Sequence, residues 1–123
     1  MKNVTFFILF VALNTTNVVA QNNDPWFSFY NKDSTMVGFK DKNGIIKIEP
    51  KFSGPTIAKK FENIMAVAEE IDGRWETYYL TKTGKKVGAD SLYFFDNGAD
   101  CEIEGFIRFK DIKTDKVGLF DKD

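Results

Sequence analysis

Carboxylates are plentiful in this sequence and gather at two places. Glu69 and Glu70 are adjacent, and a second group comprises Asp96, Asp100, Glu102 and Glu104. Paired carboxyl groups perform acid and base catalysis in glycoside hydrolysis. Adjacent residues of a strand point to opposite faces, however, so Glu69 and Glu70 are not expected to act together. The second group shares one face only within a strand, and since no enclosed pocket is indicated we interpret it as a solvated acidic edge.

The same acidic segment has a spacing that offers oxygen ligands to Ca²⁺. Asp96, Gly98, Asp100 and Glu102 follow one another at every second position. The full Asp-x-Asn-x-Asp-Gly loop is missing, and Asp and Asn are ordinary turn residues. Calcium is therefore a minor alternative, and no metal site is predicted.

The residue types that the sequence lacks exclude most other catalytic sites. The chain has no histidine, which rules out Ser-His-Asp and Cys-His arrangements. Its single cysteine, Cys101, provides neither an ordinary zinc site nor an internal disulfide, and no glycine-rich phosphate loop with a lysine is present. With no histidine to activate its thiol, Cys101 is interpreted as a small, partly buried hydrophobic residue. The sequence predicts a protein that is not an enzyme and has no cofactor.

The first 20 residues are typical of an export signal. Lys2 precedes an apolar run from Phe6 to Leu13, and the small Ala20 offers a cleavage position. The run is shorter than the roughly 20 residues that a membrane-spanning helix needs. We therefore expect a signal peptide over residues 1–20, no membrane span in the mature chain, and a periplasmic, cell-surface or secreted bacterial protein. The 17 basic and 18 acidic residues nearly cancel, which argues against nucleic acid as a partner.

Turn signals punctuate the chain beyond a lead-in over residues 21–35. Asn43-Gly44 predicts a type I′ hairpin turn, in which both residues adopt positive φ. Asp72-Gly73 and Thr83-Gly84 predict two further turns. Pro50 is expected to limit the strand that follows the first turn, because proline cannot donate to a sheet.

Short runs of aromatic and β-branched residues lie between these turns. They predict strands over residues 65–71, 74–80 and 85–87 and a loop over 52–55, while residues 57–61 fit either a short strand or a helical turn. No segment has sustained helical periodicity. The predicted fold class is all-β, built from antiparallel hairpins.

The sequence also repeats with a period of about 40 residues. Residues 37–43 match residues 117–123, and halfway between them Phe39 aligns with Tyr79 and Gly44 with Gly84. Each unit is interpreted as a small meander that stacks on its neighbours to bury its apolar face. The third copy reaches only its first strand by residue 123, so we expect a solenoid- or propeller-like array with an incomplete third unit. An open edge strand there favours association with a protein or with a second copy of the chain.

One motif recurs in these copies: a glycine, an aromatic or aliphatic residue, an aspartate and a closing glycine. Its members are Gly38, Phe39, Asp41, Gly44, Gly84, Gly118 and Asp121. The motif and its register resemble the WG-repeat family over residues 36–123. In the middle copy Tyr78 replaces the glycine and Thr81 the aspartate, and valine stands where the family has its tryptophan. The resemblance implies an extracytoplasmic bacterial β-repeat without catalytic residues.

Aromatic residues divide into two expected groups. Most phenylalanines are predicted to fill the core between units: Phe39, Phe52, Phe61, Phe95, Phe109 and Phe120. Trp26, Trp75, Tyr78 and Tyr79 are the aromatics with a chance of facing outward, and the last three are candidate ligand-binding residues. Packing in the core is the commoner fate of strand aromatics.

These observations predict a non-enzymatic, exported β-repeat module that acts in protein interaction or as a surface scaffold. Two alternatives remain open. One is a carbohydrate-binding module that uses Trp75, Tyr78 and Tyr79. The other is the N-terminal fragment of a larger repeat-containing protein, such as a hydrolase, whose activity lies elsewhere.

Overall fold

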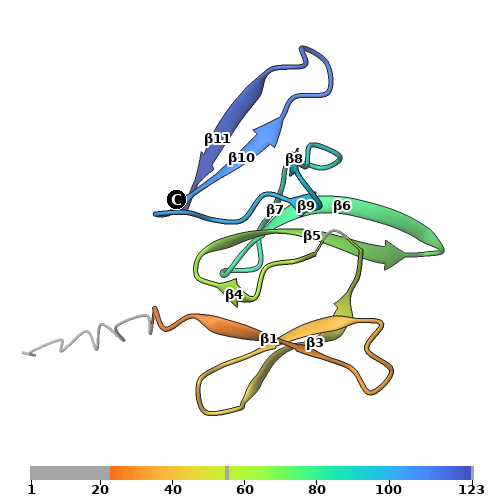
Figure 1. Cartoon of the computed structure of the whole chain (residues 1–123), viewed down its shortest axis with the longest axis vertical. Helices are drawn as coiled ribbons and strands as arrows, with labels where there is room; N and C mark the ends of the chain where they lie inside the picture. The colour runs from red at the N-terminus through yellow and green to blue at the C-terminus, as the bar shows by residue number, and fades with distance from the viewer. Residues whose placement is uncertain (1–22, 55, 123) are drawn as a thin grey trace, which may run out of the picture.

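The computed structural model describes residues 23–54 and 56–122, in which all regular structure is β (Figure 1). The predicted all-β class is thus confirmed. The strands are β1 (Trp26–Tyr30), β2 (Val37–Lys40), β3 (Ile46–Phe52), β4 (Lys60–Phe61), β5 (Ile64–Ile71), β6 (Arg74–Thr81), β7 (Lys86–Val87), β8 (Phe94–Phe95), β9 (Gly98–Ala99), β10 (Phe106–Lys110) and β11 (Val117–Asp121). No helix in these ranges is long and apolar enough to cross a membrane. The expected signal peptide, residues 1–20, lies outside the described residues.

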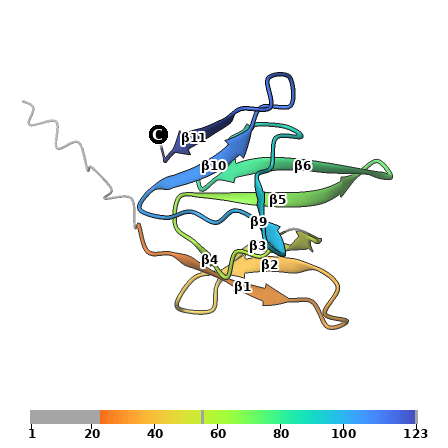
Figure 2. The same ribbon diagram turned by 45° about the horizontal axis from the view of Figure 1, so that its top comes forward.

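A curled seven-stranded sheet and two small hairpins make up the fold. The sheet has the strand order β4-β1-β2-β3-β5-β6-β7, and β10-β11 and β8-β9 are separate two-stranded sheets. Their strand pairs are antiparallel. Three long hairpins, β1–β2, β5–β6 and β10–β11, follow one another along the long axis of the molecule (Figure 1). The tip of β5–β6 projects to one side of the others (Figure 2).

The first strand forms within the segment expected to be a lead-in, residues 21–35. Residues 26–30 read Trp-Phe-Ser-Phe-Tyr, and such aromatic residues favour a pleated, half-buried strand. β1 pairs with β2 on one side and with β4 on the other. It is therefore an internal strand of the sheet, and residues 60–61, left open by the sequence, form the strand β4 beside it.

The hairpin turns are of two kinds. Asp72 and Gly73 both have positive φ, at 52° and 75°, as a type I′ turn requires. The type I′ turn predicted at Asn43-Gly44 is wrong, because Gly44 alone has positive φ there. The Asp41 carboxylate accepts hydrogen bonds from the Asn43 and Ile45 N–H groups, at 2.9 and 3.0 Å. Those bonds stabilise a three-residue turn that ends on a left-handed glycine.

The same backbone turn recurs 40 positions later. The Asp41 N–H donates to the Ile45 carbonyl oxygen at 2.9 Å, and the Thr81 N–H donates to that of Lys85 at the same distance. Gly44 and Gly84 close the two turns with φ of 82° and 88°. The Thr81 hydroxyl accepts the Lys85 N–H at 3.0 Å, as the Asp41 carboxylate accepts that of Ile45. Threonine thus substitutes for the aspartate of the motif.

Pro50 does not end its strand, contrary to expectation. β3 continues to Phe52, which was expected to begin a loop, and its register against β2 shifts between Val37 and Phe39. Such a shift marks a bulge, where a residue without an N–H is tolerated. The bulge brings the β3 backbone onto Gly38, where a Cβ atom would lie 2.5 Å from the Ile48 carbonyl oxygen. Glycine is required at this position of the motif because of that contact.

Two hydrophobic clusters lie on opposite faces of the β5–β6 hairpin. One packs it against the first hairpin through Phe39, Phe52 and Phe61, all fully buried. The other packs it against the third hairpin through Tyr79, Leu92 and Ile107, with Phe109 and Phe120 partly buried. Because alternate residues of a strand face opposite sides, both clusters need apolar residues, which explains the unbroken buried run Ile64–Ala68.

Five of the six phenylalanines predicted for the core pack in or against these clusters. Phe95 is the exception, because its side chain is 58% exposed. It lies in β8, a two-residue strand that in the described chain pairs with the equally short β9. Phe94, its neighbour in β8, is equally exposed, so neither face of this short strand is covered as the core strands are.

Candidate functional site

Tyr79 of β6 contacts both the third hairpin and the segment that leads to it. The buried Tyr79 hydroxyl lies 2.7 Å from the Arg108 carbonyl oxygen and 3.1 Å from that of Ser91, and accepts the Tyr93 N–H at 3.0 Å. The Phe120 ring meets the Tyr79 ring edge-on at 5.2 Å and stacks on Phe109 at 4.3 Å. One side chain of β6 thereby contributes a hydrogen bond and a ring contact to the packing of β10 and β11.

In each of the three long hairpins, equivalent residues lie on the outer edge of the second strand. In β2, Val37 and Phe39 pair across their outer edge with Phe52 and Ile48 of β3. In β6, Tyr79 pairs with Val87 of β7. These strands stand at intervals of 40 residues, so Val117 and Leu119 of β11 occupy the positions of Val37 and Phe39.

The turns before β2 and β11 confirm that the two backbones are in the same phase. The Asn31 N–H donates to the Met36 carbonyl oxygen at 3.0 Å, and the Asp111 N–H donates to that of Lys116 at 2.8 Å. Because hydrogen-bonding direction alternates along a strand, the Val117 and Leu119 amides point away from β10. In the described chain β11 pairs with β10 alone, so its outer edge is open at these residues.

The outward face of the third hairpin is apolar and aromatic. Phe106, Val117 and Leu119 are about half exposed or more, at 49%, 53% and 61%. Between them the Arg108 guanidinium lies over the rings of Tyr93 and Phe95, at 4.4 and 5.4 Å. Arginine and aromatic side chains at a partly apolar surface are typical of protein interfaces. This outward face, together with the open edge of β11, is called the β11 surface below.

Asp100 and Glu102, interpreted from the sequence as part of a solvated acidic edge, are instead engaged in structural contacts. Asp100 forms a two-pronged ion pair with the Arg108 guanidinium, at 2.9 and 3.0 Å, and accepts the Arg108 N–H. Although burial alone would raise it, these contacts hold the pKa of Asp100 below its ordinary value. Glu102 accepts the N–H groups of Asn63 and Ile64, both at 2.9 Å.

These contacts do not fit the alternatives raised by the acidic spacing. Asp100 and Glu102 are not in a strand, and each is oriented toward its own partner. Among the described residues no three acidic, histidine or cysteine side chains are placed to hold a metal ion. Cys101 is partly buried against the first cluster, and burial raises the pKa of its thiol. This agrees with its interpretation as a small hydrophobic residue.

The predicted patch of ligand-binding aromatics does not form. Trp75 is 56% exposed, but Tyr78 and Tyr79 are buried, so the expectation for these two is wrong. Their side chains point to opposite faces of β6, each into one hydrophobic cluster. Burial and the neighbouring Glu69, whose carboxylate accepts the Tyr78 hydroxyl at 2.5 Å, raise the pKa of Tyr78. Trp26 is partly buried, edge-on to the Phe61 ring.

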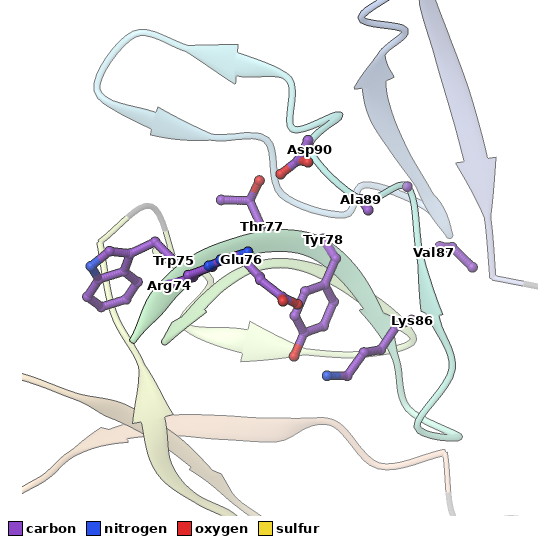
Figure 3. Close-up of a pocket in the computed structure, with 10 residues that line it drawn as sticks. Arg74, Trp75, Glu76, Thr77, Tyr78, Lys86, Val87, Ala89 and Asp90 are labelled. Atoms are coloured by element: carbon purple, nitrogen blue, oxygen red, sulfur yellow. The ribbon is translucent and has the colours of Figure 1, made fainter. Parts of the chain in front are cut away.

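A hollow of about 520 Å³ lies beside Trp75 (Figure 3). Its walls are the first part of β6, residues 74–78, and the segment 86–90. The Asp90 N–H donates to the Thr77 carbonyl oxygen at 2.9 Å, which joins the two walls. The sequence did not indicate Thr77 or Asp90, because nothing in the local pattern shows that segment 86–90 folds back along β6.

The motif residues have structural roles. Phe39 fills the core, Asp41 and the glycines at 44 and 84 form turns, and Gly38 admits the β3 backbone. At Gly118 a Cβ atom would lie 2.5 Å from the Phe109 ring, so glycine is required for that ring to stack on Phe120. Asp121 ends β11. The functional candidates Val117, Leu119 and Arg108 were missed, because exposed strand residues carry no distinctive sequence signal.

Comparison with family models, with curated proteins and with solved structures finds no match to this chain.

Proposed function

We propose that this protein is a non-enzymatic binding module that accepts an extended protein segment as an additional strand at the β11 surface. The observation that supports the proposal is the outer edge of β11. Its equivalents in the other two hairpins, β2 and β6, each receive a third strand, whereas β11 pairs only with β10 in the described chain. Main-chain hydrogen bonds along an exposed edge are a recurrent mode of peptide recognition.

The chemistry of the surface favours a partner strand with apolar side chains at alternate positions. Val117 and Leu119 point outward on the same face, and Phe106 lies on the neighbouring strand. A strand added to this edge would cover part of these side chains, which stabilises the complex by about 25 cal/mol per Å² of apolar surface buried. The bound segment would therefore resemble β3, whose residues 46–48 read Ile-Lys-Ile.

Export of this module is part of the proposal and is inferred from residues 1–20. The WG-repeat resemblance, over residues 36–123, supports the same setting of an extracytoplasmic β-repeat. In this account the carboxylates serve stability, through Arg108 and the backbone of Asn63 and Ile64.

A synthetic peptide with the sequence of residues 44–52 tests strand addition. We expect its titration to shift the amide NMR signals of Val117 and Leu119, with a dissociation constant on the order of 0.1–1 mM for so short a strand. Leu119→Lys should abolish the shifts, because a lysine on an edge strand opposes pairing.

Ile112→Lys is the matched control. Ile112 is 70% exposed, similar to Leu119, but lies in the loop before β11. This variant should bind the peptide as the parent chain does. Peptide-induced shifts that survive Leu119→Lys, or that appear only away from β11, would refute the proposal.

A further inference from the structure

We infer that the hollow beside Trp75 is a second binding site, for a neutral oligosaccharide. The site is formed by an exposed indole, the polar side chains around it, and one open backbone position of β6. It is separate from the β11 surface and does not depend on the function proposed for that surface.

The geometry places an apolar platform beside hydrogen-bonding groups. Trp75 lies at one end of the hollow, and Thr77 and Asp90 lie farther along it (Figure 3). Trp75 and Thr77 are alternate residues of β6 and therefore share a face of the strand. A sugar ring has an apolar C–H face that packs on an aromatic ring, and hydroxyl groups at its rim that need donors and acceptors.

The charges of the lining argue for a neutral ligand. Two cations, Arg74 and Lys86, balance two anions, Glu76 and Asp90. Lys86 is already 3.7 Å from the Glu69 carboxylate and lies over the Tyr78 ring at 4.5 Å. Within the described part of the chain, the side chains of Arg74, Glu76 and Asp90 form no hydrogen bond or ion pair with other side chains. Arg74 and Glu76 alternate with Trp75 and Thr77 and so project to the opposite face of β6, which leaves the Asp90 carboxylate, beside Thr77, available to bind sugar hydroxyls.

The open backbone of β6 beside the hollow fits a sugar better than an added peptide strand. β7 pairs with β6 only at Tyr79 and Leu80, and the Asp90 N–H occupies the Thr77 carbonyl oxygen. In the described chain, Trp75 is the one outward-facing backbone position of β6 between Thr77 and the β5–β6 turn. One open residue is too short to hold an added strand, which needs a run of alternating hydrogen bonds. It does provide one donor and one acceptor to a small polar ligand beside the indole.

Titration of the protein with neutral hexasaccharides of glucose, N-acetylglucosamine, xylose and mannose tests the inference. Intrinsic fluorescence reports both tryptophans, Trp26 and Trp75, and amide NMR shifts show which of them lies at the site. We expect saturable fluorescence and shifts at Trp75, Thr77 and Asp90 for at least one sugar below about 10 mM. Trp75→Ala should abolish binding, and Asp90→Asn should weaken it about tenfold through loss of a charged acceptor.

Two control variants keep this result interpretable. Tyr30→Ala removes another exposed aromatic, 63% exposed, at the end of β1, and should leave sugar binding unchanged. Leu119→Lys should also leave it unchanged, since it alters only the β11 surface. The inference is overturned if none of the four sugars gives saturable shifts, if Trp75→Ala still binds, or if the residue 44–52 peptide binds at the hollow.

Discussion

Replacing Tyr79 by phenylalanine removes one buried oxygen from the contact between β6 and the third hairpin. The ring keeps its place against Phe120, while the Tyr93 N–H loses its acceptor and the Arg108 carbonyl its donor. An unsatisfied buried polar group costs about 1–3 kcal/mol, and Tyr93 and Arg108 are only partly buried. A cost of about 1–1.5 kcal/mol for each of the two groups predicts a loss of about 2–3 kcal/mol in the free energy of unfolding.

Urea unfolding followed by far-UV circular dichroism measures this loss. With a slope of about 1.5 kcal/mol per M, typical of small proteins, the midpoint should fall by about 1–2 M. Tyr30→Phe is the matched control, because the Tyr30 side chain is exposed, and its effect should stay within about 0.5 kcal/mol. If Tyr79→Phe destabilises the protein no more than this control does, the Tyr79 hydroxyl does not hold the third hairpin in place.

Further predictions concern the ionisable groups. Glu102→Gln should lower the free energy of unfolding by about 1–3 kcal/mol in urea melts, because an amide has one oxygen where two carboxylate oxygens now accept three N–H donors. The lowered pKa of Asp100 gives stability that is present above the ordinary aspartate pKa near 4 and lost as pH falls below it. Asp100→Asn should therefore lower the melting temperature at pH 7 and flatten its fall in acid. Burial raises the pKa of Tyr79 to about 12. The neutral Tyr79 side chain therefore stabilises the fold fully below about pH 10, and this stabilisation is lost as the pH rises toward about 12. Melting scans and tyrosinate absorbance over this pH range measure the loss. Tyr79→Phe should remove that alkaline component, whereas Tyr30→Phe should retain it.

Local patterns predicted much of the fold. The Asp72-Gly73 turn and the apolar run before it indicated the β5–β6 hairpin, and both have the expected conformation. Phe39, Phe52 and Phe61 are buried as predicted, because large apolar side chains are usually buried in a folded protein. These features depend on residues close in sequence or on hydrophobicity alone.

The errors arose where distant segments decide the outcome. Tyr78 and Tyr79 are both buried because β6 lies between two hairpins, a fact that no local pattern carries. Phe95 has the same sequence signal as Phe39 but lies in a short hairpin outside both clusters and stays 58% exposed. The Asp100–Arg108 pair and the approach of Asp90 to Thr77 likewise depend on tertiary folding. The candidate sites consequently emerged only from the three-dimensional arrangement.

The outer edge of β11 is the central element of this account, and hydrogen exchange tests it directly. A copy of residues 44–52 appended after residue 123 would present a strand at an effective concentration in the millimolar range. If β11 accepts a strand as β2 does, the Val117 and Leu119 amides become hydrogen-bonded, and their exchange should slow by about tenfold or more relative to the unextended chain. Leu119→Lys in the extended chain should restore fast exchange, whereas Ile112→Lys should not. Exchange at these two amides that is unaffected by the extension would contradict the account.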